Sequence, residues 1–484
     1  MKLEYLLKPW IKDVLPECEI TGLQNDSRQV QKGDLFIAYP GAVTDGRDYI
    51  KMACTAGAAA VIYDPTGGFT PSNLSLSIPL IALEHLTIKL SSIAGRFYDH
   101  PGKKLLLTGV TGTNGKTTIA YQLAQAHALL EQKAAYIGTL GEGQVGALQS
   151  LNNTTPDALC LQKLLFNYQE NQVKHVCMEV SSHALSQYRV ADIPFTQAIF
   201  TNLSHDHLDY HHTMEDYAAA KARLFSIPGL QWAILNKDDK YAVKMLTSLA
   251  KTAEILTYGM SQDSNIKLSH WNMDMTGTQL EVSSPWGAHH FRINALGKFN
   301  MYNALAIFSS LLVSNYSVNQ VVEVMSLLKP APGRMEVVAT DPLIIVDYAH
   351  TPDALENVLI TLKQLKRGKL WVVFGCGGDR DKTKRPVMGR VASQHADKII
   401  ITSDNPRGEN PLAIVEEIAE GITTKIDTYK EVDRNRAIQE AIYRADKDDI
   451  ILIAGKGHEA YQQIGQVKYP FSDQQTVREF LKCY

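Results

Sequence analysis

Short apolar runs alternate with polar, helix-like stretches along the middle of the chain. Each run has the length and composition of a buried strand, and the stretches between runs are long enough for helices. This alternation predicts a mainly parallel sheet with helices on both faces. The runs are LLLTGV (105–110), AAYIGT (134–139), HVCMEV (175–180), QAIFTN (197–202) and WAILN (232–236).

The same alternation restarts in the last third of the chain, after a second cluster of Pro and Gly. The first cluster, His100-Pro101-Gly102, ends a helix predicted within residues 81–104, and the second is KPAPGRME at 329–336. Pro and Gly at these points favour domain boundaries. We therefore predict three α/β domains, at residues 1–101, 102–332 and 333–484. The C-terminal runs are LIIVDY (343–348), LWVVFG (370–375), KIIITS (398–403) and IILIAG (450–455).

Composition and charge exclude several classes of protein. The 484 residues carry 48 Lys and Arg against 51 Asp and Glu, a formal net charge of −3, which provides no long-range field for nucleic acid or an anionic membrane. The 6 cysteines include no CxxC pair, which argues against a disulfide framework and a cysteine-type zinc site. The first residues do not resemble a secretory signal, and no apolar run is long enough to span a membrane. We expect a cytoplasmic protein without nucleic-acid partners or membrane insertion.

The strongest local motif is GVTGTNGKTT at residues 109–118, which follows an apolar run and opens a predicted helix at about 116–130. Glycines let backbone N–H groups approach a bound anion, and a helix N-terminus adds partial positive charge. In such a loop Lys116 contacts the β- and γ-phosphates and Thr117 holds Mg²⁺. Val110 stands where the strict GxxxxGK[ST] pattern requires glycine, so the spacing is GxxGxxGKT. The alternative is a glycine-rich turn with an exposed lysine.

Acidic and histidine residues follow two later runs. Glu179 lies at the end of HVCMEV, and a carboxylate beside a triphosphate is a natural Mg²⁺ ligand; the alternative is a helix cap or a surface carboxylate. In TNLSHDHLDYHH (201–212) one histidine is a candidate metal ligand, while most are expected to pack or to face solvent. Lys221 lies in a predicted helix at 215–225, and composition alone favours a solvated lysine there.

A series of motifs, in this order along all three segments, resembles the Mur ligases, the ATP-dependent amino-acid-adding enzymes of peptidoglycan synthesis. The resemblance implies an N-terminal UDP-sugar-binding α/β domain, a central P-loop ATPase-like parallel sheet and a C-terminal Rossmann-like α/β domain. The motifs are GTNGKTT (112–118), NNTTPD (152–157), MEVSSHAL (178–185), TNLSHDHLDYH (201–211), YAAAKARLF (217–225), LGKFNMYNALAI (296–307), PGRME (332–336), DYAHTPD (347–353) and AGKGHE (454–459).

The tetrapeptide DNPR at 404–407 resembles the family members that add meso-diaminopimelate rather than lysine. A physical reason supports this subtype. Meso-diaminopimelate is lysine with a second carboxylate at its far end, and an arginine such as Arg407 pairs with a carboxylate in bidentate fashion. The alternative is a simple turn, because Asn-Pro favours turns and arginine is commonly exposed.

The resemblance also implies roles for particular residues. The implied ATP site consists of Gly112, Thr113, Asn114, Gly115, Lys116, Thr117, Thr118, Asn303, Arg334, Asp347 and His350. The implied site for the UDP-sugar dipeptide consists of Asn25, Ser27, Asn153, Thr154, Thr155, Ser181, Gln187 and Arg189. The implied diaminopimelate site consists of Arg380, Asp404, Asn405, Pro406, Arg407, Gly455 and Glu459. The segment at 39–50 resembles a family loop that touches the nucleotide, although its centre, residues 42–44, is less polar than is usual there.

The implied reaction is amide formation between diaminopimelate and UDP-N-acetylmuramoyl-L-alanyl-D-glutamate, driven by ATP through an acyl phosphate. Its catalytic residues would be Lys116, Glu179, His207 and Lys221, with Mg²⁺ held by Thr117, Glu179, His207 and Lys221 after conversion to a carbamate. We expect a monomer. Three alternatives remain: another ligase of the superfamily such as a folylpolyglutamate synthetase or a different Mur step, a P-loop protein that uses ATP as a regulatory switch, and a degenerate non-catalytic homologue.

Overall fold

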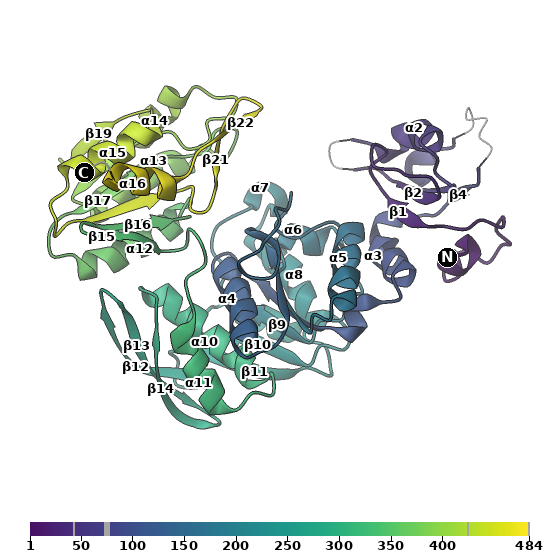
Figure 1. Cartoon of the computed structure of the whole chain (residues 1–484), viewed down its shortest axis with the longest axis horizontal. Coiled ribbons are helices and arrows are strands. Elements are labelled where there is room, and N and C mark those ends of the chain that lie inside the picture. The colour runs from purple at the N-terminus through teal and green to yellow at the C-terminus, as the bar shows by residue number, and fades with distance from the viewer. Residues whose placement is uncertain (42–43, 72–77, 424, 483–484) are drawn as a thin grey trace.

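A computed structural model of the chain describes residues 1–41, 44–71, 78–423 and 425–482. Its elements form three α/β units in a row, with the N-terminal sheet at one end and the C-terminal sheet at the other (Figure 1). Each unit's sheet lies within one of the three predicted ranges, and the boundaries themselves stay predictions. Of the segment at 39–50, residues 42 and 43 lie outside the described residues.

The N-terminal sheet is fully parallel, and its strands lie side by side in chain order. Every residue of its second strand is buried, because apolar clusters cover both faces. The strands are β1 (Gly22–Gln24), β2 (Asp34–Ala38), β3 (Ala60–Tyr63) and β4 (Leu80–Ala82), and the helices are α1 (Leu3–Leu7), α2 (Ile50–Thr55) and α3 (Leu86–Phe97).

The central sheet has ten strands in the order β14-β13-β12-β11-β10-β9-β5-β8-β6-β7. Its middle, from β12 to β6, is parallel, as the alternating pattern predicts. Two separate apolar cores cover its two faces. The central strands are β5 (Leu106–Thr111), β6 (Ala134–Gly138), β8 (His175–Glu179), β9 (Gln197–Phe200), β10 (Trp232–Asn236) and β11 (Glu254–Gly259). The helices are α4 (Lys116–Leu129), α5 (Ala158–Glu170), α6 (Ser182–Ser186), α7 (Leu208–His211), α8 (Met214–Ala222), α9 (Ala242–Thr247), α10 (Lys298–Leu312) and α11 (Val318–Leu327).

The two edges of the central sheet depart from the parallel arrangement. At one edge β7 (Gly141–Gly143) pairs antiparallel with β6. At the other, β12 (Ile266–Asp274), β13 (Gly277–Ser284) and β14 (Gly287–Ile293) form an antiparallel ribbon that the apolar runs do not predict. Alternate residues of β13 are exposed, so the ribbon lacks the continuous apolar signal of a strand buried on both faces.

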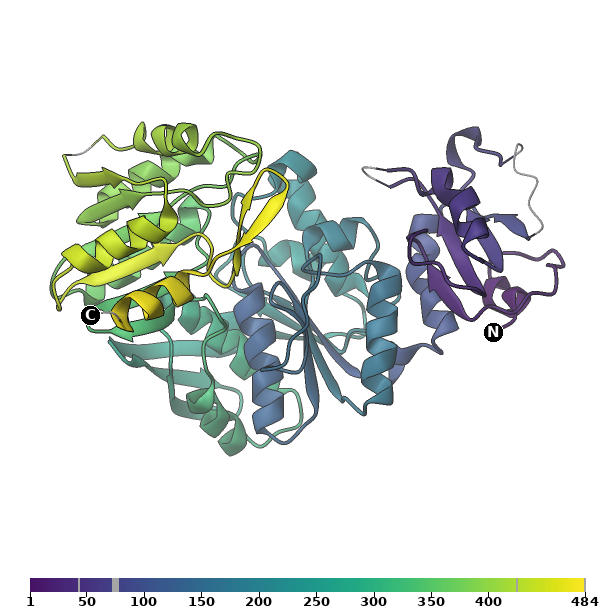
Figure 2. The same cartoon turned by 45° about the horizontal axis from the view of Figure 1, so that its top comes forward.

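The C-terminal sheet has the order β15-β16-β20-β17-β18-β19 and is parallel except for the edge pair β15–β16. A separate hairpin, β21–β22, projects toward the central unit (Figure 2). The strands are β15 (Glu336–Thr340), β16 (Leu343–Asp347), β17 (Leu370–Phe374), β18 (Lys398–Ile401), β19 (Asp427–Lys430), β20 (Ile450–Ala454), β21 (Tyr461–Ile464) and β22 (Val467–Pro470). The helices are α12 (Pro352–Leu365), α13 (Lys384–His395), α14 (Pro411–Ala419), α15 (Arg434–Arg444) and α16 (Asp473–Lys482).

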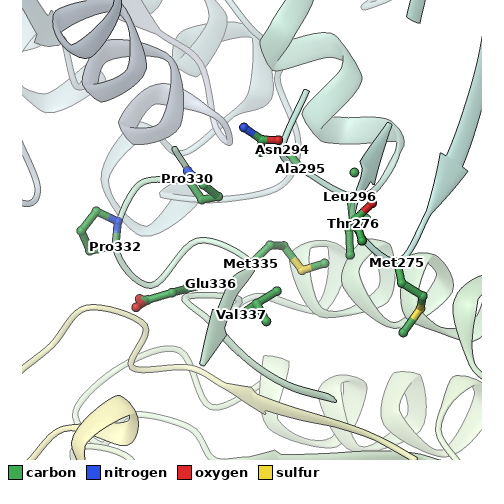
Figure 3. Close-up of a pocket in the computed structure, with 11 residues that line it drawn as sticks. Met275, Thr276, Asn294, Ala295, Leu296, Pro330, Pro332, Met335, Glu336 and Val337 are labelled. Carbon is green, nitrogen blue, oxygen red and sulfur yellow. The ribbon is translucent and has the colours of Figure 1, made fainter. Parts of the chain in front are cut away.

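Side-chain contacts join the three units. On the N-terminal side, Gln162 of α5 donates to Ser91 Oγ of α3 at 3.2 Å. On the C-terminal side, Arg334 donates to Thr117 Oγ1 at 3.1 Å. A cavity of about 320 Å³ lies beside this second junction, between the turn at 275–277, the residues after β14 and the connecting segment 330–337 (Figure 3). None of the predicted site residues lines it, so the cavity belongs to the junction between units.

No helix among the described residues is long and apolar enough to cross a membrane.

Two buried histidines stack against each other at the base of the central sheet. The rings of His127, near the end of α4, and His175, at the start of β8, lie 3.8 Å apart between centroids. The Nδ1 atom of His127 lies 2.8 Å from the hydroxyl of Tyr316. Burial lowers the pKa of His127 well below its usual value and that of His175 to about 4. Both imidazoles are therefore neutral in the folded protein at neutral pH.

This pair predicts a loss of stability in mild acid. The unfolded chain takes up protons on histidine near pH 6.5, whereas the folded chain resists protonation until about pH 4 for His175. Between these values the unfolded state binds more protons, so the stabilisation present above pH 6.5 is lost as the pH falls, by about 3 kcal/mol for a shift of this size. The free energy of unfolding in urea should fall less between pH 7 and pH 4 for His175→Phe than for the native chain. The control His290→Phe alters an exposed histidine and should keep the native slope; equal slopes in all three proteins would contradict the prediction.

Candidate active site

The glycine-rich loop between β5 and α4 is held from outside by the residues that follow β9. The backbone N–H of Thr113 donates to the Asn202 carbonyl at 2.8 Å, and the N–H of Asn114 donates to Asn202 Oδ1 at 3.0 Å. The hydroxyl of Thr201 donates to the Asn114 carbonyl at 2.6 Å. Because β9 pairs with β5, these anchors reach the loop from the adjacent strand end. The loop is therefore fixed before any ligand arrives.

Two glycines of this loop occupy positions that no other residue fits. A Cβ atom on Gly112, whose φ is 149°, would lie 1.8 Å from Thr201 Oγ1. A Cβ atom on Gly115, whose φ is 88°, would lie 2.5 Å from Asn303 Oδ1. Val110, by contrast, is a fully buried residue of β5. The strict pattern fails at position 110 because that residue still belongs to the strand, where a core side chain is required.

Two lysines converge on one carbonyl of the loop. Lys116 Nζ donates to the carbonyls of Gly112 and Thr113 at 2.9 and 2.7 Å, and Lys221 Nζ donates to that of Gly112 at 2.8 Å. Lys221 is 1% exposed, and its ammonium lies 4.5 Å above the Tyr217 ring. Burial, and then the charge of Lys116, lower the pKa of Lys221 well below its usual value. The solvated lysine that composition alone favours at position 221 is therefore wrong.

Glu179 is the last residue of β8, and its carboxylate is buried among four donors. It accepts hydrogen bonds from Thr117 Oγ1 at 3.0 Å and from the Tyr136 hydroxyl at 2.5 Å. The backbone N–H and hydroxyl of Thr139 add bonds of 2.8 and 3.2 Å. With 1% of its surface exposed, Glu179 is neither a surface carboxylate nor a helix cap. It lies against the first turn of α4, where a phosphate-bound cation would sit.

The histidines of 201–212 separate into two kinds, as the sequence predicts. His211 is buried and its Nε2 lies 2.9 Å from Ser182 Oγ, so it packs against α6. His205 and His212 face solvent. His207 lies at the start of α7 with its side chain 45% exposed, 5.0 Å from the His183 ring between centroids. Of these histidines, His207 is the one implied as a metal ligand.

Other residues of the implied ATP site lie around the junction of the central and C-terminal units. The guanidinium of Arg334 packs 4.4 Å above the Tyr348 ring while it donates to Thr117. Asp347, the last residue of β16, accepts the N–H groups of Met335 and Ala349, both at 2.7 Å. Burial raises the pKa of Asp347. This carboxylate therefore shapes the turn that carries Arg334. The remaining members are placed as follows: Thr118 is buried in α4, Asn303 is buried beside Gly115, and His350 is exposed just after β16.

The implied amino-acid site forms where β18 and β20 end. Asn405 Nδ2 donates to Glu459 Oε2 at 2.8 Å, which joins the DNPR turn to the AGKGHE segment. Gly455 packs against Asp404, since a Cβ atom on the glycine would lie 2.7 Å from Asp404 Oδ2. Pro406 is buried, and its carbonyl lies against Gly378 of the neighbouring loop. The structure thus brings these members of the implied set together.

Arg407 adopts a left-handed backbone conformation, with φ of 50°, that the β21–β22 hairpin holds. Its N–H donates to the Gln463 carbonyl at 3.1 Å, and its carbonyl accepts the N–H of Gly465 at 2.8 Å. Its Nη1 donates to the Gly378 carbonyl at 2.8 Å, and no hydrogen bond within the described part of the chain engages Nε or Nη2. Arg407 is half-buried and fixed, which differs from the exposed arginine of a simple turn.

A buried arginine holds the loop of Arg380 beside the DNPR loop. Arg380 is exposed, and its Nη1 donates to the Asp379 carbonyl at 3.0 Å. The fully buried Arg385 donates to Glu409 at 2.9 Å and to Glu417 at 2.7 Å. Glu409 in turn accepts the N–H of Asp379 at 2.6 Å. The two arginine-bearing loops are thus tied through one carboxylate.

Residues of the implied UDP-sugar site on the central unit cluster beside Glu179. Thr155 Oγ1 donates to the Glu179 carbonyl at 2.9 Å and accepts the Ser181 N–H at 3.0 Å. Arg189 donates to the Thr155 carbonyl at 2.8 Å and to Gln187 Oε1 at 2.6 Å. Thr154 Oγ1 lies 3.2 Å from the Thr139 hydroxyl, and Asn153 is exposed.

The two N-terminal members of this set lie on another unit. Asn25 donates to the Tyr39 hydroxyl at 3.2 Å. Ser27 is 6% exposed, and its Oγ lies 3.5 Å from Met52 Sδ. The implied UDP-sugar set is therefore divided between two units, as expected for a long substrate bound across them.

Models of known protein families match most of the chain. The model described as "Mur ligase family, catalytic domain" matches residues 19–98, "Mur ligase middle domain" matches 110–311, and "Mur ligase, glutamate ligase domain" matches 333–457. The chain belongs to the Mur ligase family. Two relatives called UDP-N-acetylmuramoyl-L-alanyl-D-glutamate–2,6-diaminopimelate ligase are each 43% identical to it. The Chromobacterium violaceum protein aligns over 96% of this chain and 95% of its own length, and the Coxiella burnetii protein over 99% of both.

A solved structure of a protein with the same name extends this likeness to the fold. It covers 100% of this Mur ligase and 99% of its own chain, with 34% identity and a TM-score of 0.73. The arrangement of three α/β units is thus that of the family.

Several residues that build the site of this Mur ligase are not predicted from the sequence. Tyr136 and Thr139 supply three of the four donors to Glu179, yet both lie in AAYIGT, which reads as a core strand. Their polar tips in an otherwise apolar run are the available signal. Thr201 and Asn202 lie in a motif whose clustered histidines suggest a metal ligand, although these two residues anchor the phosphate loop.

The donors near the loop fit a hard cation better than a transition metal. Within the described ranges, no group of three or more His, Cys, Asp or Glu side chains is placed to hold a metal by itself. Thr117 and Glu179 offer a hydroxyl and a carboxylate 3.0 Å apart. Mg²⁺ prefers oxygen ligands and keeps waters or phosphate oxygens in its other positions, so it suits this sparse set.

Loss of one donor to the buried carboxylate should destabilise the folded chain. Tyr136→Phe removes the 2.5 Å hydrogen bond to Glu179 and keeps the ring. A hydrogen bond to a charged group contributes about 1.5–3 kcal/mol, so the free energy of unfolding in urea should fall by about that amount. Tyr443→Phe, at a 70% exposed tyrosine, is the matched control and should change it by less than about 0.5 kcal/mol. Equal stability of Tyr136→Phe and the native chain would show that the bond contributes nothing.

Proposed function

We propose that this Mur ligase joins meso-diaminopimelate to UDP-N-acetylmuramoyl-L-alanyl-D-glutamate and converts ATP to ADP and phosphate, in the cytoplasmic assembly of peptidoglycan precursors. The observation that carries the proposal is Arg407. The hairpin fixes its backbone, the Gly378 carbonyl accepts from its Nη1, and no hydrogen bond among the described residues engages Nε or Nη2. The names of relatives that align over nearly the whole chain support the same reaction.

Side chains of both charge signs would recognise the amino acid. Arg407 and Arg380 suit carboxylates, and Glu459 and Asp404 suit an ammonium group. Lysine lacks the carboxylate at its far end, so its binding would leave a half-buried guanidinium without a partner. A site built around such a pair rejects the analogue that cannot complete it. Asn405, Pro406 and Gly455 shape the same pocket.

The chemistry transfers the γ-phosphate of ATP to the D-glutamate side-chain carboxylate, which gives an acyl phosphate. The amine of diaminopimelate then attacks the acyl carbon, and phosphate leaves. The amides of 112–118, with Lys116 and Arg334, neutralise and position the phosphates, since phosphoryl transfer depends on both. Asn303 would lie near the base, and Asp347 and His350 near the ribose and phosphates. The C-terminal unit covers the site and keeps the acyl phosphate from water.

Lys221 is suited to conversion into a carbamate by CO₂. Only a neutral amine attacks CO₂, and the lowered pKa of Lys221 favours that form. The conversion would turn this neutral amine into an anion beside Lys116, whose Nζ donates to the same loop carbonyl. Thr117 and Glu179 would hold a first Mg²⁺, His207 would help to hold a second, and the carbamate would offer a further anion able to bind Mg²⁺. Bound Mg²⁺ would neutralise the charge that develops on the transferred phosphoryl group.

The UDP-sugar dipeptide would bind across the N-terminal and central units. Asn25 and Ser27 would face the nucleotide, and Asn153, Thr154, Thr155, Ser181, Gln187 and Arg189 would hold the sugar and peptide. We place the unit boundaries at residues 101/102 and 332/333. We also infer a monomer.

Two kinds of alternative predict different behaviour. A folylpolyglutamate synthetase or a different Mur step has no need for Arg407 beside Glu459 and Asn405. A regulatory switch or a degenerate homologue has no need for a buried Lys221 against the loop. An amino-acid panel with the UDP-dipeptide and ATP separates them, with ADP release as the readout.

Diaminopimelate should support ADP release, and lysine should not. Arg407→Ala removes the bidentate partner, so kcat/KM for diaminopimelate should fall by about a hundredfold or more, while ATP binding stays near native. Arg436→Ala, at a 75% exposed arginine of the same unit, should leave both unchanged. Turnover with lysine but not diaminopimelate would contradict the proposed substrate. Full activity of Arg407→Ala would show that Arg407 does not recognise it.

Lys221 should carry CO₂ in the active enzyme. Carbon-13 NMR with labelled bicarbonate should show a carbamate resonance in the native chain and none in Lys221→Met, whose turnover should fall by at least about a hundredfold through loss of the anion. Lys298→Met, at an exposed lysine of α10, should keep both the resonance and the activity. Native turnover in Lys221→Met would contradict the role.

A further inference from the structure

A fully buried lysine lies directly behind the amino-acid site and has no role among the residues assigned so far. Lys456 follows β20, and none of its side chain is exposed. Its ammonium donates to Asn405 Oδ1 at 3.0 Å and to Glu459 Oε2 at 3.0 Å. Lysine is almost never fully buried unless it is paired, so this placement calls for a specific partner set.

The bonds of Lys456 set the orientation of the Asn405 amide. The Oδ1 atom accepts from two donors, Lys456 and the N–H of Gln463 at 2.8 Å. The Nδ2 atom must therefore face the other way, toward Glu459 Oε2 at 2.8 Å. A flipped amide would place its NH₂ group against two donors. Lys456 thus selects one of the two orientations that an asparagine can adopt.

The same bonds divide the two oxygens of Glu459 between protein and ligand. Its Oε2 accepts from Lys456 and from Asn405, whereas no hydrogen bond to Oε1 occurs within the described ranges. The side chain of Glu459 is 18% exposed. One oxygen is consequently held by the protein, and the other has no hydrogen-bond partner among the described residues.

The charged side chains around Lys456 leave room for one substrate ammonium group. Asp404 and Glu459 contribute two negative charges, and Lys456 contributes one positive charge. Arg434, buried beneath the site, is already paired with the buried Asp473 through bonds of 2.8 Å. With Arg407 and Arg380 assigned to the substrate carboxylates, Asp404, Glu459 and Lys456 leave a net charge of one negative, which a single ammonium group neutralises. Without Lys456 two carboxylates would face one ammonium, and a buried charge would be left uncompensated.

We propose that Lys456 is a positioning residue for the amino-acid substrate: it orients Asn405 and holds one oxygen of Glu459, so that the other oxygen receives a substrate ammonium group. This role rests on the proposed function. Lys456 touches no reacting atom and acts through its two partners.

The test is a double-mutant cycle on the full-length enzyme. Lys456→Met and Glu459→Gln should each raise KM for diaminopimelate by at least about tenfold, with KM for ATP and for the UDP-dipeptide within about twofold of native. Because both changes break one unit, the double variant should be no worse than the poorer single variant. Lys398→Met, at a paired lysine on β18 of the same unit, is the matched control and should keep all three KM values.

Each outcome decides a different question. Multiplying effects in the double variant, or an unchanged KM for diaminopimelate in Lys456→Met, would overturn the positioning role. A parallel rise in all three KM values would also overturn it, since a general structural defect has no preference among substrates. If Lys456→Met does not fold, Lys456→Gln retains a donor of smaller size and should give an intermediate KM; a native KM there would count against the role. A native enzyme that never uses diaminopimelate would refute the proposed function instead.

Discussion

The rest of the site depends on one buried carboxylate with four donors. Glu179 is buried, and the hydrogen bonds from these donors replace the water that burial removes. Those donors come from both neighbouring strands, since β8 lies between β5 and β6. Thr117 lies in the first turn of the helix after β5, and Tyr136 and Thr139 lie on or just after β6. The parallel sheet is what places them at the same edge. Local donors of this kind let a chain with a net charge of −3 handle several anions without a basic surface.

The Thr117 hydroxyl, which donates to Glu179, also bonds to the C-terminal unit. Thr117 Oγ1 accepts from Arg334, whose turn is shaped by Asp347. Asn114 of the phosphate loop reaches Asp353 of α12 at 3.3 Å. Docking of the C-terminal unit and the geometry of the phosphate site are therefore linked by direct bonds. A change in the angle between the units must alter the donors that surround the loop.

Much of the parallel architecture is predictable from the sequence, because its strands are short, apolar and buried on both faces. The ribbon β12–β14 is not, since its strands expose residues such as His270 and Trp271 and carry no continuous apolar run. Within the site, Glu179 follows from its position at a strand end, and Lys116 follows from the glycine-rich motif that opens a helix. Tyr136 and Lys456 do not, because Glu179 and Asn405, to which they donate, lie 43 and 51 residues away along the chain and only the topology brings them near. The burial of Lys221 likewise arises from tertiary packing, whereas composition alone favours a solvated lysine there.

The left-handed backbone of Arg407 has a consequence for how such a site evolves. Its conformation is maintained by Gln463 and Gly465, which belong to a hairpin encoded by a separate stretch of the gene. A four-residue exchange at 404–407 would leave that hairpin shaped for the old arginine, and a hairpin exchange would leave the arginine unsupported. Drift toward a different amino acid must then pass through a poorer enzyme. Selection against that intermediate favours lineages that keep their original amino-acid substrate.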